Sequence, residues 1–308
     1  MLDIAPGPRR ARGPWRGRFQ PYLFIAIPLA YLAVFQVYSI VQGIALSLTD
    51  TQLLNPSAGV YVGFRNYADV IASAEFWGSV RVTLAYTFGC VLGSVGLGLG
   101  AALILNRSFR GNAIVRSIVI MPWAAPGIAA VMVFVWIFDN QFGVANFLLR
   151  GVGLVDRNLL WRSSPDLALP TVMIVTVWHS FPLCALVLLA AMQSVLGDLY
   201  DAARVDGADA LNIVKNVTLP SIMPTLVTLS LFMTIWSLRR FDTIWVMTQG
   251  GPVGRTNTIV IDIYRETFRF FDVGRGATVG VLGLVIAGVF TIFYFLSSRR
   301  MEKRGRRA

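Results

Sequence analysis

Six long apolar segments constrain this chain more than any other feature of its sequence. A helix that crosses the hydrocarbon core of a bilayer needs about 20 consecutive, mostly apolar residues. The chain is 56% hydrophobic and only 14% charged, whereas soluble domains are about 45–50% apolar and about 25% charged. We therefore predict an all-α membrane protein with six transmembrane helices, at residues 21–46, 79–105, 113–138, 167–192, 222–247 and 277–297.

The chain is basic, with 27 Lys and Arg residues against 16 Asp and Glu residues and a net charge of +11. The basic residues cluster at the two chain ends and beside apolar segments, which favours a membrane protein over a nucleic-acid-binding one. The first apolar segment follows an arginine-rich stretch, as in a signal peptide. It is longer than the roughly 7–15 residues of a cleaved apolar region, so we predict an uncleaved span.

Lys and Arg mark the cytoplasmic side of a membrane protein, and this rule sets the predicted topology. Both ends are expected to be cytoplasmic, as basic tails at 1–20 and 298–308 that flank the six-helix domain at 21–297. A cytoplasmic loop at 193–221 interrupts this domain. The connections on the outer side are then 47–78, 139–166 and 248–276.

Glycine pairs spaced four residues apart lie in the second span, at Gly89/Gly93 and Gly96/Gly100. Such pairs allow two helix backbones to approach closely in a membrane. The alternative is a merely flexible, glycine-rich helix.

Two prolines, Pro122 and Pro126, lie inside the third span. Each should kink the helix and free backbone carbonyl groups. Neighbouring helices or a water-filled cavity must then satisfy those carbonyl groups.

The loop between the fourth and fifth spans predicts two short amphipathic helices at 198–218. Asp198 is expected to cap the first helix and Asp209 the second. Between them, Gly207 suits the left-handed position that ends a helix. A loop that only connected two spans could be short and polar, so the apolar face of this pair is expected to need a partner.

This segment resembles the cytoplasmic signature of the permease subunits of ATP-binding-cassette importers. That signature has the sequence EAA, a Gly six residues after the Glu, and an LP pair before the next span. The sequence of this segment resembles most the carbohydrate-uptake type. Residues 241–268 are similar to the FDxIxxxTxGGP block, which marks the first of the two unlike permeases in such importers. The residues that carry the signature are Tyr200, Asp201, Ala202, Ala203, Asp206, Gly207, Ala208, Leu219 and Pro220.

The resemblance implies a type I importer permease in a bacterial inner membrane. Its expected partners are a second homologous permease, two ATPase subunits, an extracytoplasmic solute-binding protein, membrane lipid, and a sugar or related polar solute. The 198–218 pair would dock into the ATPase subunits and act as a lever. ATP and Mg²⁺ would be bound by those subunits, so no cofactor is expected in this chain.

Asp201 departs from the family pattern, because the family has Glu at this position. The charge is kept, but the side chain is shorter by one methylene group. The resemblance implies an ion pair with the ATPase; the alternative is that Asp201 only caps its own helix.

Five polar or aromatic residues in the spans are candidates for the translocation pathway. They could form a polar wall for a hydroxyl-rich solute, and the arginines could serve an anionic group. Alternatively, the arginines reach outward to the interface with Asp242 paired to one of them, the histidine is hydrogen-bonded structure, and the aromatic residues are packing. The candidates are Arg239, Arg240, Asp242, Trp245 and His179.

Other functions find less support in the sequence. There is no GxxxxGK[ST] loop, so ATP hydrolysis by this chain is not expected. Neither a nucleophile with its base nor a set of metal ligands is visible, and the two cysteines, Cys90 and Cys184, form no CxxC motif. The runner-up is a stand-alone secondary transporter driven by an ion gradient. Such carriers often show internal repeats, and we find no clear repeat.

Overall fold

The computed structural model describes residues 16–305. The predicted basic tails therefore fall partly outside the described residues, at 1–15 and 306–308. Within the described part the chain is helical, and the isolated β-bridges, such as Thr49 with Tyr61, do not build a sheet. The prediction of an all-α protein is confirmed.

Five described helices are long and apolar enough to cross a membrane. The first is a continuous rod of α1 (Arg16–Leu32), a π-helical segment (Ala33–Val37) and α2 (Tyr38–Ser47). A second rod is formed by α10 (Ala210–Ile213), a π-helical segment (Val214–Thr218) and α11 (Leu219–Leu238). The other three are α4 (Ala74–Leu105), α8 (Ala168–Gln193) and α14 (Val273–Gly305).

The third predicted span, 113–138, is not one kinked helix. It is divided into α5 (Asn112–Ala124) and α6 (Gly127–Ile137), which are bent by 95° at the break. Pro122 is tolerated inside α5, and Pro126 occupies the position before α6, where it cannot continue the preceding helix. The chain has six candidate spans if this bent pair counts as one.

The fifth predicted span, 222–247, is also divided. The helix α11 ends at Leu238, and a separate short helix, α12 (Asp242–Thr248), follows. Between them lie two adjacent arginines, whose charges are costly to bury in an apolar helix. Hydropathy carried the prediction through this break because Phe241 and α12 are mostly apolar.

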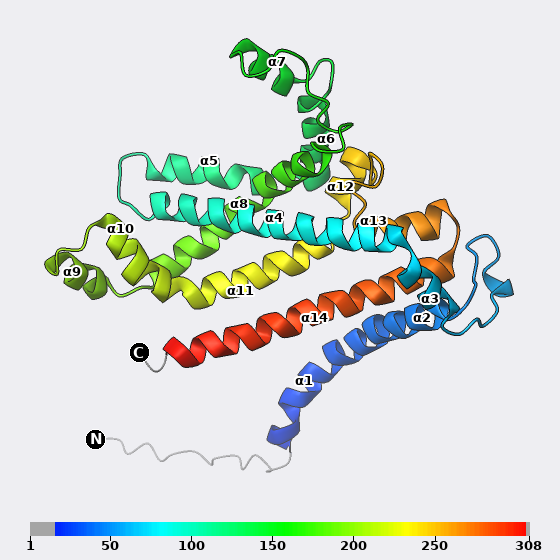
Figure 1. The fold of residues 1–308 in the computed structure, drawn as a ribbon. Coiled ribbons are helices and arrows are strands. Elements are labelled where there is room, and N and C mark those ends of the chain that lie inside the picture. Colours follow the sequence, from blue (N-terminus) through cyan, green and yellow to red (C-terminus); the bar gives the residue numbers. More distant parts are fainter. Residues whose placement is uncertain (1–15, 306–308) are drawn as a thin grey trace, which may run out of the picture.

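The remaining short helices lie between the spans. On the side of the 47–78 connection is α3 (Arg65–Ala72), and after α6 comes α7 (Val144–Gly151). The loop after α8 contains α9 (Gly197–Val205). The last connection holds α13 (Ile259–Tyr264) and a π-helical segment at Arg265–Arg269. Figure 1 shows α9, α10 and the C-terminal end of α14 at one end of the bundle, with α3 and α13 at the other.

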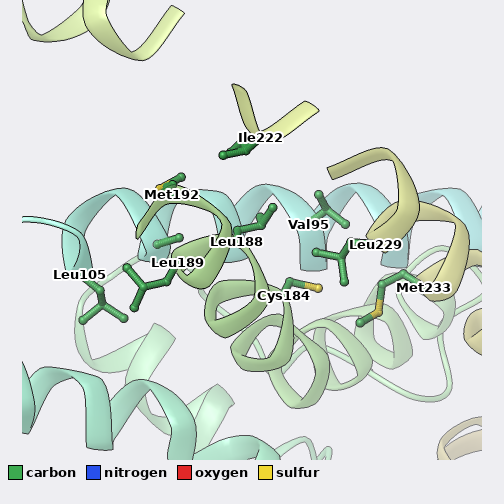
Figure 2. Packing of buried hydrophobic residues seen from close by; sticks show 10 residues of the cluster. Val95, Leu105, Cys184, Leu188, Leu189, Met192, Ile222, Leu229 and Met233 are labelled. Atoms are coloured by element: carbon green, nitrogen blue, oxygen red, sulfur yellow. The ribbon is translucent and has the colours of Figure 1, made fainter. Parts of the chain in front are cut away.

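The core of the bundle is the packing of α4 against α8, with α11 and α5 alongside. One buried apolar cluster fills the end of the bundle near α9, with side chains from α4, α8 and α11 that converge in Figure 2. A second cluster, around Tyr86 and Ile244, packs between α4, α6, α8, α12 and α13, and a third joins α3, α4, α13 and α14. In contrast, the apolar side chains of α1 from Phe24 onward and most of those of α2 are exposed, and Figure 1 shows α1 diverging from the bundle.

Three glycines of α4 allow the close approach to α8. A Cβ atom on Gly89 would lie 2.8 Å from Sδ of Met173, and one on Gly93 would lie 2.7 Å from Cγ2 of Val177. One on Gly98 would lie 2.5 Å from the Cβ atom of Cys184. The first predicted glycine pair therefore makes a helix contact. The second pair does not, since a Cβ atom on Gly96 or Gly100 would meet open space.

Candidate functional site

The loop between α8 and α11 forms a helix hairpin, here called the hairpin and comprising residues 197–218. The helix α9 starts at Gly197, one residue before the predicted cap, and Leu196 in the capping position provides no side-chain bond. Asp198 therefore lies in the first turn, where its charge favours the positive end of the helix dipole, and the prediction that it caps the helix is wrong. Asp209 does cap α10, because its carboxylate accepts from the backbone N–H of Asn212 at 2.8 Å.

The turn of the hairpin is made by Gly207, with a φ angle of +79°. This left-handed conformation is unfavourable for residues with a side chain and is adopted readily by glycine. A Cβ atom at this position would meet nothing within 4 Å, so the requirement comes from the backbone and not from crowding. The predicted role of Gly207 in reversing the chain agrees with this geometry.

The other signature residues are spread over both arms of the hairpin. Tyr200 is half-buried and faces Thr218, with the two hydroxyl oxygens 3.5 Å apart. Asp201 forms an exposed ion pair with Arg204 of the same helix at 2.7 Å. Asp201 does not cap α9, since it lies inside the helix. The remaining signature residues are Ala202, Ala203, Asp206 and Ala208 in the first arm and turn, and Leu219 and Pro220 at the start of α11.

The hairpin buries almost nothing of its own. Neither α9 nor α10 contains a buried residue. On either side of the turn, Val205 is 87% exposed and Leu211 is 75% exposed. Behind the hairpin, a hollow of about 830 Å³ separates it from the α4–α5 connection at Asn106–Ser108. The two apolar side chains at the tip thus have no covering surface within the described residues.

A small polar pocket brings together most of the predicted pathway residues. Its volume is about 280 Å³, and it lies where α5, α8 and α11 meet. Both helix breaks described above contribute to it, through the last turn of α5 and through the residues that join α11 to α12. The lining residues, here called the arginine pocket, are Trp123, His179, Trp236, Arg239, Arg240, Phe241 and Asp242.

The two arginines differ in their surroundings. Arg240 is half-buried, with its guanidinium 6.0 Å from the ring centroid of Trp236 and an Nη2 donor 3.4 Å from the Ser180 hydroxyl oxygen. Its Nε atom is buried without a hydrogen-bond partner. Arg239 is exposed. Among the residues that the structure describes, neither arginine forms an ion pair with Asp242, so the alternative of a salt-bridged pair finds no support.

His179 lies in α8, opposite the break between α5 and α6. Its Nε2 atom is 3.4 Å from the carbonyl oxygen of Ala125, a group that the break leaves without a helical partner. The histidine is therefore hydrogen-bonded structure and a wall of the pocket at once.

Trp245, by contrast, does not reach the arginine pocket. It packs in an aromatic cluster with Tyr264, at 4.4 Å between ring centroids, and with Phe241 at 5.5 Å. Arg269 lies 5.6 Å from its ring. Trp245 lines a different hollow of about 590 Å³ on the side of α13. No local sequence pattern indicated this separation, which follows from the helix break after Leu238.

An apolar hollow of about 650 Å³ shares Trp123 and Trp236 with the arginine pocket. Its other lining residues come from α8 and α11, including Thr225 and Thr228. The two tryptophans thus stand between a polar and an apolar compartment on one face of the bundle. Trp123 was missed by the sequence reasoning, although its position between two prolines could have indicated it.

A buried polar network holds the segment after α12 against the bundle. Asn257 donates through Nδ2 to the Ser79 hydroxyl and to the Asp262 carboxylate, both at 3.0 Å. Asn257 is 2% exposed and Asp262 is 4% exposed. Burial raises the pKa of Asp262 above its ordinary value, and the hydrogen bond from Asn257 opposes this effect. In the part of the chain that the structure describes, no group of three or more His, Cys, Asp or Glu side chains could hold a metal ion.

Comparison with known proteins gives a consistent match. Residues 94–304 match the family model described as binding-protein-dependent transport system inner membrane component. The chain is 34% identical to the trehalose/maltose transport system permease protein MalF of Thermococcus litoralis, with 90% of this chain and 93% of the relative covered. It is 30% identical to the sulfoquinovosyl glycerol transport system permease protein SmoG of Agrobacterium fabrum, with 90% and 89% covered.

The fold is also similar to a solved one. A chain of the bacterial alginate ABC transporter, in complex with an alginate pentasaccharide-bound periplasmic protein, superposes with a TM-score of 0.80. The sequence identity is 22%, and the match covers 94% of this chain and 98% of the solved one.

Proposed function

Because this chain belongs to the inner membrane components of binding-protein-dependent transport systems, we propose that it imports a carbohydrate or related polar solute as one of two permease subunits. It is a multi-pass inner-membrane subunit and is not itself an enzyme. We further propose that separate ATPase subunits, which bind ATP and Mg²⁺, drive it through the hairpin.

The observation that carries this proposal is the exposed tip of the hairpin. Val205 and Leu211 project on either side of the Gly207 turn with no covering surface within the described residues. Exposed apolar side chains on an ordered helix pair indicate a protein partner. The signature residues Asp206, Gly207 and Ala208 form this tip, which supports docking into a groove of the ATPase.

The connection of the hairpin to the bundle supports a lever function. Its first arm follows directly from α8 and its second arm continues into α11. These two helices carry His179 and Trp236, and the two arginines of the pocket follow directly after α11. A displacement of the hairpin on ATP binding would therefore move both walls of the pocket, which is what a switch between inward-facing and outward-facing states needs.

We propose that the solute passes the arginine pocket and the apolar hollow beside it. Non-helical backbone at membrane depth is tolerated where it lines a cavity or is buried in protein. Transporter binding sites are often built from such discontinuous helices. Two broken helices meet at this one pocket, which supports its assignment to the pathway. Trp245 is left out of it, because it lies on a different hollow.

The proposed topology places both chain ends and the hairpin in the cytoplasm. It is supported by the common position of the hairpin and the C-terminal end of α14 at one end of the bundle (Figure 1). The basic residues in the sequence at 298–308 also support a cytoplasmic C-terminal end, because Lys and Arg are enriched on that side of the membrane. The domain limits proposed from the sequence, 1–20, 21–297 and 298–308, follow from this topology. An extracytoplasmic solute-binding protein would then meet the opposite end, near α3 and α13.

The solute class is proposed from the relatives. The names of the two similar permeases refer to trehalose or maltose and to sulfoquinovosyl glycerol, both of which are saccharides or saccharide derivatives. The solved neighbour is an alginate transporter. These names support a carbohydrate or a derivative of one as the solute of this chain.

A labelling experiment tests the docking of the hairpin. Val205→Cys should react with a water-soluble maleimide in the isolated permease pair and be protected when the ATPase subunits are bound. Val152→Cys, which replaces a 70% exposed valine after α7, is the matched control and should react in both states. Equal labelling of residue 205 with and without the ATPase subunits, in an assembly that transports, would contradict the proposal.

A further inference from the structure

Within the described residues, the arginine pocket carries more positive than negative charge. Two guanidinium groups line it, and the only acidic residue in its wall, Asp242, makes no ion pair with either of them. Three of the seven lining residues are aromatic, at positions 123, 236 and 241. Aromatic walls lower the local dielectric constant, so a cation there is screened less than in bulk water.

Arg240 is held in place but keeps most of its hydrogen-bonding capacity. Trp236 covers one face of its guanidinium and Ser180 accepts one bond at the long distance of 3.4 Å. An arginine has five N–H donors in a planar fork. The fork fits the paired oxygens of a carboxylate, sulfonate or phosphate group, and such charge-assisted bonds are about twice as strong as neutral ones. Arg239, exposed beside it, adds a second positive charge at the same mouth.

A neutral sugar would use this site poorly. Its hydroxyl groups could accept from the arginines, but they would leave the net positive charge of the pocket, two arginines against one aspartate, without compensation. Charged residues in membrane segments usually pair with an opposite charge. Within the described residues that partner is missing, which leaves the solute or another subunit to provide it.

We propose that the imported solute carries an anionic group, such as the carboxylate, sulfonate or phosphate of an acidic saccharide, and that Arg240 binds this group with Arg239 beside it. The inference rests on the proposed function, because it assumes that the pocket belongs to the pathway. The aromatic faces of Trp123 and Trp236 would contact the apolar face of the sugar ring.

The first step of the test identifies the solute. The cognate solute-binding protein is titrated calorimetrically with neutral oligosaccharides and with uronate, sulfonated and phosphorylated saccharides. We expect it to bind an anionic saccharide. A binding protein specific for neutral sugars would overturn the inference and leave the proposed function intact.

The second step measures ATP-driven uptake of that solute by the complete transporter in proteoliposomes. Arg240→Gln should lower uptake about tenfold to a hundredfold, the loss expected for a charge-assisted hydrogen bond. Arg240→Lys should restore part of it, and Arg239→Gln should lower it less. Arg81→Gln, on the exposed surface of α4, is the control and should transport normally. ATP hydrolysis stimulated by the loaded binding protein should persist in all variants.

The outcomes distinguish a failure of this inference from a failure of the proposed function. Normal uptake of an anionic solute by Arg240→Gln would overturn the inference, since another subunit or lipid would then neutralise the arginines. If Arg240→Gln does not assemble, Arg240→Lys and Arg239→Gln are used in its place. Normal uptake of an anionic solute by both of these variants would overturn the inference. Absence of ATP-driven uptake of every solute that the binding protein binds would overturn the proposed function and this inference with it.

Discussion

Two loops of this chain can be compared directly, because each joins one end of α11 to another span. The hairpin at 197–218 precedes α11, and the segment at 249–272, here called the outer block, follows α12. The two arms of the hairpin contain no buried residue before Thr218. The outer block buries five polar residues, Thr256, Asn257, Thr258, Asp262 and Glu266.

The difference lies in where the hydrogen bonds go. In the hairpin they stay within the segment, such as Asn212 to Asp209, Arg204 to Asp201, and Thr218 to Tyr200 across the two arms. In the outer block they cross the molecule, because Asn257 reaches Ser79 and the backbone N–H of Ile259 donates to Thr83. A segment tied only to itself can move as a unit and present its surface to a partner. A segment that is hydrogen-bonded to α4 is held in place and provides a fixed framework relative to which the hairpin can move.

The largest effect is expected for Gly207→Asp in the hairpin, which should abolish ATP-driven uptake. Aspartate must adopt the left-handed conformation, at a cost of about 1–2 kcal/mol, and it adds a charge at the proposed docking tip. Membrane insertion should be intact, because a Cβ atom there meets open space. Uptake in proteoliposomes and the yield of folded protein are the measurements.

The chain offers a matched control for that substitution. Gly153, after α7, also has a left-handed φ angle, of +72°, and also has open space around it. Gly153→Asp carries the same backbone penalty at a distance from the hairpin and should leave uptake largely unchanged. Similar losses from both variants would mean that the hairpin has no special role, and near-normal transport by Gly207→Asp would count heavily against the lever.

The next effect is on stability, and an Asn→Ala substitution in each of the two loops should distinguish them. Asn257→Ala removes two buried hydrogen bonds and leaves Asp262 without its donor, so it should destabilise the outer block by about 2–3 kcal/mol. Asn212→Ala in the hairpin removes only an exposed side chain. The backbone N–H of residue 212, which donates to the Asp209 carboxylate, is kept, so stability should change little. Thermal unfolding in detergent gives the comparison, and equal shifts would contradict it.

The same contrast explains what the sequence could predict. The hairpin was predicted almost completely, including the Asp209 cap and the Gly207 turn, because its determinants lie within a few residues of each other. The predicted cap, Asp198, lies two residues after the observed capping position at Leu196, an ordinary error at a helix end. The network of the outer block was not foreseen, since Ser79 and Asn257 are separated by 178 positions and no local pattern connects them.

The helix breaks and glycines show the same limit within the spans. Hydropathy located the apolar segments and the prolines predicted a kink in the third span. Neither the 95° break at Pro126 nor the break after Leu238 was predicted, because apolar residues continue on both sides. The carbonyl group of Ala125 at the first break is contacted by His179, which lies 54 positions away, and no local pattern connects the two. Likewise, spacing alone selected Gly96 and Gly100, whereas the helix face that meets α8 carries Gly98.

A smaller effect concerns pH and the outer block. Burial raises the pKa of Asp262 and of Glu266 in the folded state, with the ion pair from Arg275 opposing the shift of Glu266. Folding thus favours the protonated form of both carboxyl groups. The stability that these protonated groups contribute is complete below their ordinary pKa values of about 4. It is lost as the pH rises through the raised pKa values of the folded state. The outer block should open more readily at neutral pH than in mild acid.

Hydrogen exchange of the peptides covering 256–269, corrected for the intrinsic pH dependence of exchange, measures this opening. Asp262→Asn should flatten the pH dependence, while Asp69→Asn, on the exposed helix α3, should not. The hairpin peptides should show no such trend. A trend of the opposite sign in the outer block would mean that the charged forms, held by Arg275 and Asn257, are the favoured ones.

The smallest effect on the chain itself is expected for Asp201, the residue that departs from the family pattern. Its ion pair with Arg204 is exposed on both sides, and exposed pairs of this kind contribute little to stability. Asp201→Asn should therefore leave thermal unfolding of the permease nearly unchanged. If the carboxylate also contacts the ATPase, the same variant should weaken ATPase binding severalfold, and Asp201→Glu should restore it. If Arg204→Gln causes the same loss of ATPase binding, the Asp201–Arg204 ion pair only orders α9 and the carboxylate does not contact the ATPase. The shorter side chain of aspartate, compared with glutamate, would then not affect docking.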